Sequence, residues 1–130
     1  MKVGGKHFRT IWRKPDDKRV VELIDQRFLP HDLVIEEVST VEQMATAIRE
    51  MHVRGAGLIG ASAGYGMYLA AIEAAQRDSF DEHIARAAAQ LRATRPTAVN
   101  LCWAIERQLQ SIAAGKTSNE KVAIALRTAD

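Results

Sequence analysis

Two arginines, Arg54 and Arg95, stand where the sequence predicts that a helix is about to begin. The free N–H groups and the dipole of a helix N-terminus favour an anion, and a guanidinium group offers a planar fork that matches phosphate oxygens. Gly55 and Ala56 follow the first arginine directly, and Asn100 lies about one turn inside the helix that follows the second. A solvated helix-end arginine is the better interpretation of either one alone. Because the arrangement occurs twice in one small chain, the pattern favours an anion-binding site about as strongly as it favours two solvated helix-end arginines.

The glycines of the first arrangement also match the dinucleotide-binding pattern G-x-G-x-x-G, at Gly55, Gly57 and Gly60. That pattern binds a pyrophosphate where a strand precedes it and a helix follows. Here the preceding segment carries apolar side chains at helical spacing, and Ser39 with Glu42 forms a capping box at its start. The sequence therefore predicts a connection between two helices rather than a nucleotide-binding fold.

The remaining reactive side chains do not form a catalytic group in the sequence. Cys102 is interpreted as a small buried side chain rather than a nucleophile, because it has no cationic partner near it in sequence. The four histidines lack metal-ligand spacing, so no metal site is predicted, and a surface position is the better interpretation of His52. No nucleophile, base and orienting group can be assembled. We therefore assign no catalytic residue to this chain and expect no cofactor.

Length and charge narrow the class of protein. A chain of 130 residues is expected to form one domain. The 18 basic and 16 acidic side chains give a net charge of +2, which indicates neither a nucleic acid nor an anionic membrane as a partner. The single cysteine excludes an internal disulfide, and the sequence has neither a membrane-spanning run nor a signal-peptide core. A cytoplasmic protein is expected.

The order of predicted elements is typical of an α+β fold. Alternating apolar and polar residues with turn signals between them predict a small antiparallel sheet of about three strands, at residues 8–13, 19–24 and 33–38. Start and stop signals then predict a bundle of about five helices, beginning near residues 39, 57, 79, 98 and 117. The second of these, which is rich in glycine and alanine, is predicted to be the buried centre of the bundle.

The last predicted helix still carries an apolar stripe where the sequence ends at Asp130, and no stop signal follows it. We therefore expect residues 1–130 to be one domain of a longer, two-domain protein.

Three motifs occur in an order and spacing found in one family: LIDQRFLP at 23–30, AIREMHVRGA at 47–56 and RPTAVNLCWA at 95–104. Through these motifs, and over essentially its whole length from Thr10, the chain resembles the amino-terminal part of methylthioribose-1-phosphate isomerases. Their superfamily also contains the regulatory subunits of translation initiation factor 2B.

The resemblance implies the reversible aldose–ketose isomerisation of 5-methylthioribose 1-phosphate to 5-methylthioribulose 1-phosphate in methionine salvage. It implies a homodimer whose subunits have a second, Rossmann-like domain that carries the catalytic cysteine and aspartate and is absent from this chain. Substrate contacts fall, by resemblance, on Arg54, Gly55, Ala56 and Arg95. Asn100 joins these candidates because of its position in the second helix start.

One departure from the family is Gly57-Leu58, where relatives commonly carry Pro-Ala. Loss of the proline removes a preset φ at the helix start, which leaves the exact sugar phosphate open. The alternative function is a non-catalytic regulatory or interaction module of the initiation-factor type. Retention of Arg54, Arg95 and Asn100 favours the isomerase.

Overall fold

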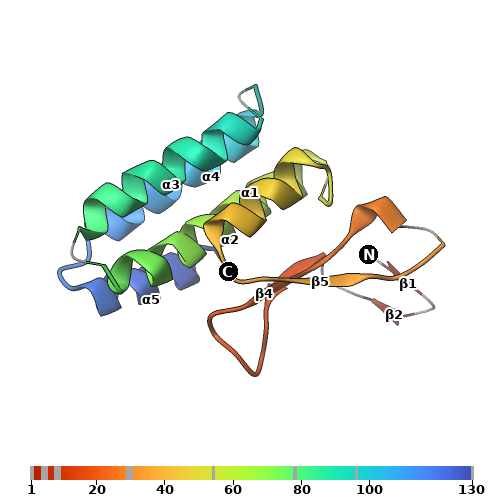
Figure 1. Ribbon diagram of the computed structural model, residues 1–130, viewed down its shortest axis with the longest axis horizontal. Helices are drawn as coiled ribbons and strands as arrows, with labels where there is room; N and C mark the ends of the chain where they lie inside the picture. The colour runs from red at the N-terminus through yellow and green to blue at the C-terminus, as the bar shows by residue number, and fades with distance from the viewer. Residues whose placement is uncertain are drawn as a thin grey trace.

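The computed structural model describes residues 2–3, 6–7, 10–28, 31–53, 55–77, 79–95 and 97–129. The sheet and the helices within these ranges lie at opposite sides of the molecule (Figure 1). None of these helices is long and apolar enough to cross a membrane. Arg54 lies outside the described residues, so the predictions for its side chain are not tested here.

The main sheet has three antiparallel strands in the order β3 (Ile11–Arg13), β4 (Val21–Ile24) and β5 (Ile35–Val38). A separate two-stranded sheet pairs β1 (Lys2–Val3) with β2 (Lys6–His7). All three strands of the main sheet are shorter than predicted from the alternation pattern; positions 8 and 9 lie outside the described residues. A short 3-10 helix, η1 (Gln26–Phe28), follows β4.

Strand register decides which side chains face the helices. Leu23 pairs with Ile11 on one side and with Glu36 on the other, and Val21 pairs with Val38. Directly paired residues of antiparallel strands share a face of the sheet. Because Ile11, Val21, Leu23 and Val38 are buried in the core, Glu36 lies on the core side too.

The helices confirm the α+β prediction. They are α1 (Val41–Arg49), α2 (Ala56–Ala75), α3 (Phe80–Thr94), α4 (Val99–Ala113) and α5 (Ser118–Ala129). The central position predicted for α2 is correct, because α2 contacts each of the other four helices and β3. Tyr65, Met67 and Leu69 of α2 are almost completely buried.

The predicted helix starts are only partly correct. The first helix is capped by Thr40, not Ser39: the Thr40 side chain accepts from the backbone N–H of Gln43, and the Gln43 side chain accepts from the N–H of Ser39. A cap by Thr40 therefore replaces the predicted box, and the Gln43 side chain reaches back to the residue before the N-cap rather than to the N-cap itself. Ser79 precedes α3 but makes no side-chain cap bond. The prediction for α5 is confirmed, since Thr117 accepts from the N–H of Glu120 at 3.1 Å.

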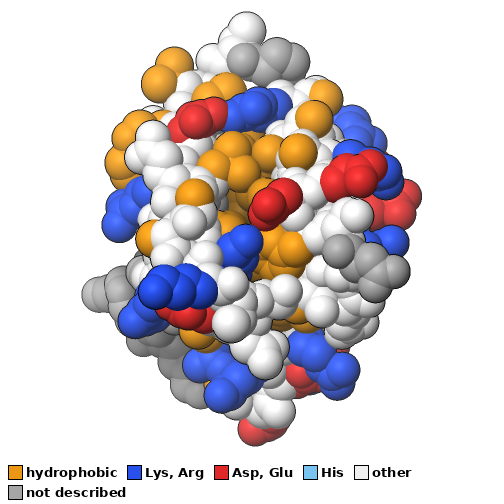
Figure 2. Space-filling model, turned by 90° about the vertical axis from the view of Figure 1, so that its left-hand side faces the viewer, with side chains coloured by type: hydrophobic (Ala, Val, Ile, Leu, Met, Phe, Trp, Pro, Cys, Tyr) orange, Lys and Arg blue, Asp and Glu red, His pale blue; other side chains and the backbone are white. Residues whose placement is uncertain are grey.

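The apolar core comes close to the surface at one end of the bundle. Figure 2 shows the left-hand side of Figure 1, where hydrophobic side chains gather in the middle of the face and charged side chains surround them.

Cys102, which the sequence places in the core, is only partly buried between buried Leu101 and exposed Trp103. The position of Cys102 toward the outer face of α4 explains the difference.

Candidate anion site at two helix N-termini

The N-terminal turns of α2 and α4 touch. A Cβ atom added to Gly60 would lie 3.3 Å from both the Cβ and the carbonyl oxygen of Asn100. The two helices therefore approach closely within their first turns, and the absence of a side chain at Gly60 permits that approach. Which residues of the two helices touch depends on how elements that are distant in the sequence pack.

Among the described residues, no side chain caps either helix start. The N-cap residues are Gly55, whose φ is +93°, and Ala98, and neither makes a side-chain cap bond. Gly55 and Ala56 are exposed, as is Asn100. The first N–H groups of two neighbouring helices thus remain available to an anion, and both dipoles favour one at this end of the bundle.

Arg95 lies beside the same region. It is the C-cap residue of α3, it is half-buried, and its Nε donates to the carbonyl oxygen of Ile48 at 3.3 Å. Ile48 belongs to the last turn of α1, a few residues before Gly55. Arg95 is therefore joined to the end of α1, whereas the convergence of the Arg54 and Arg95 side chains on one anion stays a prediction.

A groove of about 800 Å³ begins at these helix ends and runs between α2, α4 and α5. Gly57 and Gly60 line it from α2, and Asn100 and Trp103 line it from α4. The Trp103 side chain is 61 % exposed, which is high for a tryptophan. The groove thus extends the candidate site along small residues and Trp103 to two further arginines, Arg107 and Arg127.

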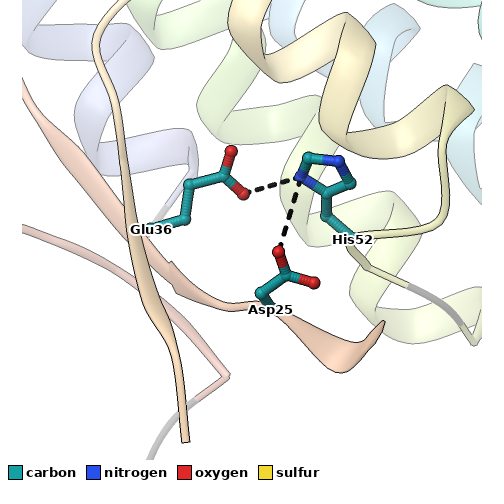
Figure 3. A group of neighbouring side chains, drawn as sticks. All are labelled: Asp25, Glu36 and His52. Atoms are coloured by element: carbon teal, nitrogen blue, oxygen red, sulfur yellow. Dashed lines mark hydrogen bonds and ion pairs between the residues drawn. The ribbon is translucent and has the colours of Figure 1, made fainter. Parts of the chain in front are cut away.

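A buried polar cluster lies next to the chain segment that leads into α2 (Figure 3). His52 Nδ1 lies 2.7 Å from Glu36 Oε2 and 3.9 Å from Asp25 Oδ2. His52 is only 7 % exposed, so the surface position predicted for it is wrong. Because the carboxylate of Glu36 can only accept, His52 carries a proton on Nδ1 and donates it to Glu36.

Arg27 completes this cluster from its outer side. Its Nε and NH2 groups donate to the two carboxylate oxygens of Asp25 at 3.0 and 2.7 Å. The side-chain hydrogen bonds from Arg27 lower the pKa of Asp25 below its ordinary value, against the opposing effect of burial. Asp25 is thus an ionised carboxylate, 2 % exposed, held by a bidentate guanidinium pair.

The three side chains Asp25, Glu36 and His52 offer ligand atoms that all lie within 4.8 Å of one another. Such a set could in principle hold a metal ion. Both oxygens of Asp25 already accept from Arg27, however, and Glu36 already accepts from His52. A neighbouring guanidinium also opposes a second cation. The cluster is therefore best explained by the hydrogen bonds it makes.

Sequence reasoning missed this cluster because it compared the histidines only with one another. Asp25 stood within the quoted LIDQRFLP motif, and Glu36 stood on a predicted strand. Glu36 and Glu37 were expected on opposite faces of that strand. This is confirmed, since Glu36 bonds to His52 and Glu37 pairs with Lys14 at 2.8 Å.

Residues 52–130, more than half of the chain, match the Initiation factor 2 subunit family. The chain belongs to this family. The matched region begins at His52 and contains both helix starts of the anion site. The resemblance inferred from the three motifs is thereby confirmed at the level of the superfamily.

The proteins that this chain is similar to include isomerases and an initiation-factor subunit. The chain is 48 % identical over 106 residues to the methylthioribose-1-phosphate isomerase of Rhizobium meliloti, covering 82 % of this chain and 28 % of that protein. Two solved structures are similar over 95 % of this chain. One is the delta subunit of translation initiation factor eIF-2B from A. fulgidus, with a TM-score of 0.84, 39 % identity and 36 % of that chain covered. The other is 5-methylthioribose 1-phosphate isomerase from Pyrococcus horikoshii, with a TM-score of 0.83, 35 % identity and 35 % of that chain covered. The chain thus spans about a third of the length of these relatives.

Proposed function

We propose that this chain is the substrate-binding amino-terminal domain of an aldose–ketose isomerase that converts 5-methylthioribose 1-phosphate to 5-methylthioribulose 1-phosphate. The observation that carries the proposal is the contact between two helix N-termini that lack side-chain caps, at Gly55 and Ala98, with Arg95 beside them. A phosphate group is the ligand chemistry that such a pair of helix ends favours. The names of the isomerase relatives supply the sugar.

Each candidate residue has a distinct role in this proposal. The backbone N–H groups at Gly55 and Ala56 donate to phosphate oxygens, and the guanidinium groups of Arg54 and Arg95 balance the phosphate charge. Asn100 offers an amide to a sugar hydroxyl at the mouth of the groove. The groove gives the carbon chain of the sugar room to extend along α4.

The groups that move the proton between adjacent sugar carbons are proposed to lie in a second, Rossmann-like domain. That domain would close over the exposed helix ends, within a cytoplasmic homodimer. The side chains described at the helix ends and along the groove include Arg95, Asn100, Arg107 and Arg127. Guanidinium and amide groups bind and orient a ligand but do not serve as an acid–base pair. Substrate binding and catalysis are thus divided between domains.

The proposal is tested by titrating the 130-residue chain with 5-methylthioribose 1-phosphate and following backbone amide signals by nuclear magnetic resonance. We expect the largest shifts at Gly55, Ala56 and Asn100. Unphosphorylated 5-methylthioribose is the matched ligand control and should leave the Gly55 and Ala56 signals in place.

A matched pair of variants tests Arg95. Arg95→Gln should weaken binding, whereas Arg86→Gln should not, because Arg86 is an exposed α3 residue that pairs with Glu82 one turn away. If the sugar phosphate moves none of the three amides, the substrate-binding function is wrong. A regulatory module of the initiation-factor type, for which the similarity to the eIF-2B delta subunit is the supporting observation, would then be the better proposal.

A further inference from the structure

The segment between α1 and α2 is held in an unusual backbone conformation. Met51 has a φ of +63°, a left-handed value that a non-glycine residue keeps only when its surroundings enforce it. Two residues later, Val53 is completely buried. Gly55 then takes a φ of +93° and begins α2. The backbone on both sides of position 54 is therefore fixed in direction before the anion site begins.

Hydrogen bonds from other elements provide that enforcement, and they converge on His52. The N–H of His52 donates to the carbonyl of Ala47 in α1 at 2.9 Å, and its carbonyl accepts from the N–H of Gln26 in η1 at 2.7 Å. Its imidazole donates to Glu36 of β5 at 2.7 Å. His52 thus joins the last turn of α1 to two parts of the β-region.

Asp25 and Glu36 are themselves fixed from the sheet. The N–H of Asp25 donates to the carbonyl of Val34 at 2.8 Å, and its carboxylate is held by Arg27. Glu36 takes its direction from the register of β5, which places it on the core side opposite Leu23. Glu36 faces the imidazole from β5, and Asp25 faces it from the position directly after β4 (Figure 3).

We propose that Asp25, Glu36 and His52 are positioning residues for the anion site. They hold Val53 and Gly55 so that the first N–H groups of α2 face the phosphate beside the start of α4. The sheet serves as the rigid support for this segment, which gives the β-region a part in ligand binding although its strands do not line the groove. This inference takes the identity of the ligand from the proposed function. The ordering of the backbone at Val53 and Gly55 does not depend on it.

Two neighbouring glutamates of β5 provide a matched test. Glu36→Ala removes the acceptor of His52, whereas Glu37→Ala removes a partner of Lys14 on the other face of the same strand. We expect Glu36→Ala to weaken binding of 5-methylthioribose 1-phosphate to the 130-residue chain at least fivefold. Glu37→Ala should leave the affinity unchanged. Equal affinities of these two variants would overturn the proposal.

A second pair of variants covers the case in which Glu36→Ala does not fold. His52→Asn places an amide N–H near the position of Nδ1 and should keep most of the affinity, whereas His52→Leu should lose it. Thermal unfolding of both variants separates positioning from general loss of structure. If the affinities of the two His52 variants vary with their melting temperatures, and not with the presence of a donor at position 52, the positioning role is wrong.

A readout without any ligand separates this inference from the proposed function. Amide relaxation in Glu36→Ala and His52→Leu should show increased motion at Val53, Gly55 and Ala56, with α4 unchanged. If the wild-type chain fails to bind the sugar phosphate but this motion increases, the proposed function is wrong and the positioning role stands. If the motion does not increase, the positioning role is wrong whatever the ligand.

Discussion

At the scale of single residues, the chemistry of this chain depends on arginines with different tasks. Arg27 donates to Asp25 through two nitrogens and so supports the fold. Within the described residues, the one hydrogen bond that the Arg95 side chain makes is long and runs from Nε to the carbonyl oxygen of Ile48. In the proposed function, the planar fork of Arg95 binds the ligand, whereas that of Arg27 binds Asp25.

Replacement of Arg54 by lysine tests whether the family-matched arginine has such a task. Lysine keeps the positive charge but loses the bidentate fork. We expect Arg54→Lys to weaken binding of 5-methylthioribose 1-phosphate at least tenfold, about 1.4 kcal/mol at 25 °C. Calorimetric titration measures the change. An affinity equal to that of the wild type would make Arg54 an ordinary helix-end residue.

Asp25 should make the stability of the fold sensitive to acid. Its folded-state pKa is lowered, chiefly by the hydrogen bonds from Arg27, so its contribution is present above the unfolded pKa and is lost as the pH falls through the folded value. Because the ordinary pKa of aspartate is about 3.9, the loss begins near and below that pH. Urea unfolding at a series of acidic pH values should show a shallower decline for Asp25→Asn than for the wild type. Parallel declines would contradict this account.

At the scale of elements, α2 packs inside the bundle along most of its length and begins at the candidate anion site. Its glycines lie in different surroundings in these two parts. Gly66 lies deep in the bundle, where an added Cβ would meet Leu91 Cδ1 at 3.1 Å and Met44 Cγ at 3.2 Å. Gly57 lies at the exposed start of the helix, where an added Cβ would have nothing within 4 Å. The first glycine is required for packing and the second is not.

Alanine at each position should therefore change stability in opposite directions. Gly66→Ala crowds α1 and α3 and should destabilise the chain by about 1–3 kcal/mol, reduced by the better helix propensity of alanine. Gly57→Ala has no clash and should stabilise it, by at most about 1 kcal/mol. Chemical unfolding of the two variants measures both effects. Destabilisation by Gly57→Ala would show that the start of α2 needs glycine for a reason that packing does not explain.

At the scale of the whole molecule, the sheet and the helical bundle share one apolar core, and the segment that leads into α2 lies between them. The helix ends and the groove of the anion site lie on the bundle, and the buried cluster beside that segment draws on strands β4 and β5. Trp103 and Val99 stay 61 % and 78 % exposed next to the groove. In the proposed two-domain protein, this apolar surface is where the second domain would close.

The division of labour between domains predicts that the 130-residue chain has no isomerase activity by itself. Isomerisation needs groups that exchange a proton with adjacent sugar carbons, and the described residues at the anion site do not provide them. A coupled assay with 5-methylthioribose 1-phosphate measures turnover. Activity that survives repurification of the chain would contradict the prediction.

The sequence by itself determined the local features of this protein. The glycine and alanine content of α2 predicted its central place, and the start signals predicted where α2 and α4 begin. Anion binding at these helix ends stays a prediction. The cap of α1 was predicted one residue early, because Ser39 and Thr40 offer the same chemistry and only the backbone conformation distinguishes them.

Only the tertiary structure decided which of these features meet. The contact of Gly60 with Asn100 depends on the packing of two helices that are distant in sequence. The cluster of Asp25, Glu36 and His52 depends on the register of β5 and on the path of the chain between α1 and α2. Local periodicity records which face of an element is apolar, but it holds no information on which distant polar group will lie opposite. His52 was therefore expected at the surface, although the fold buries it between two carboxylates.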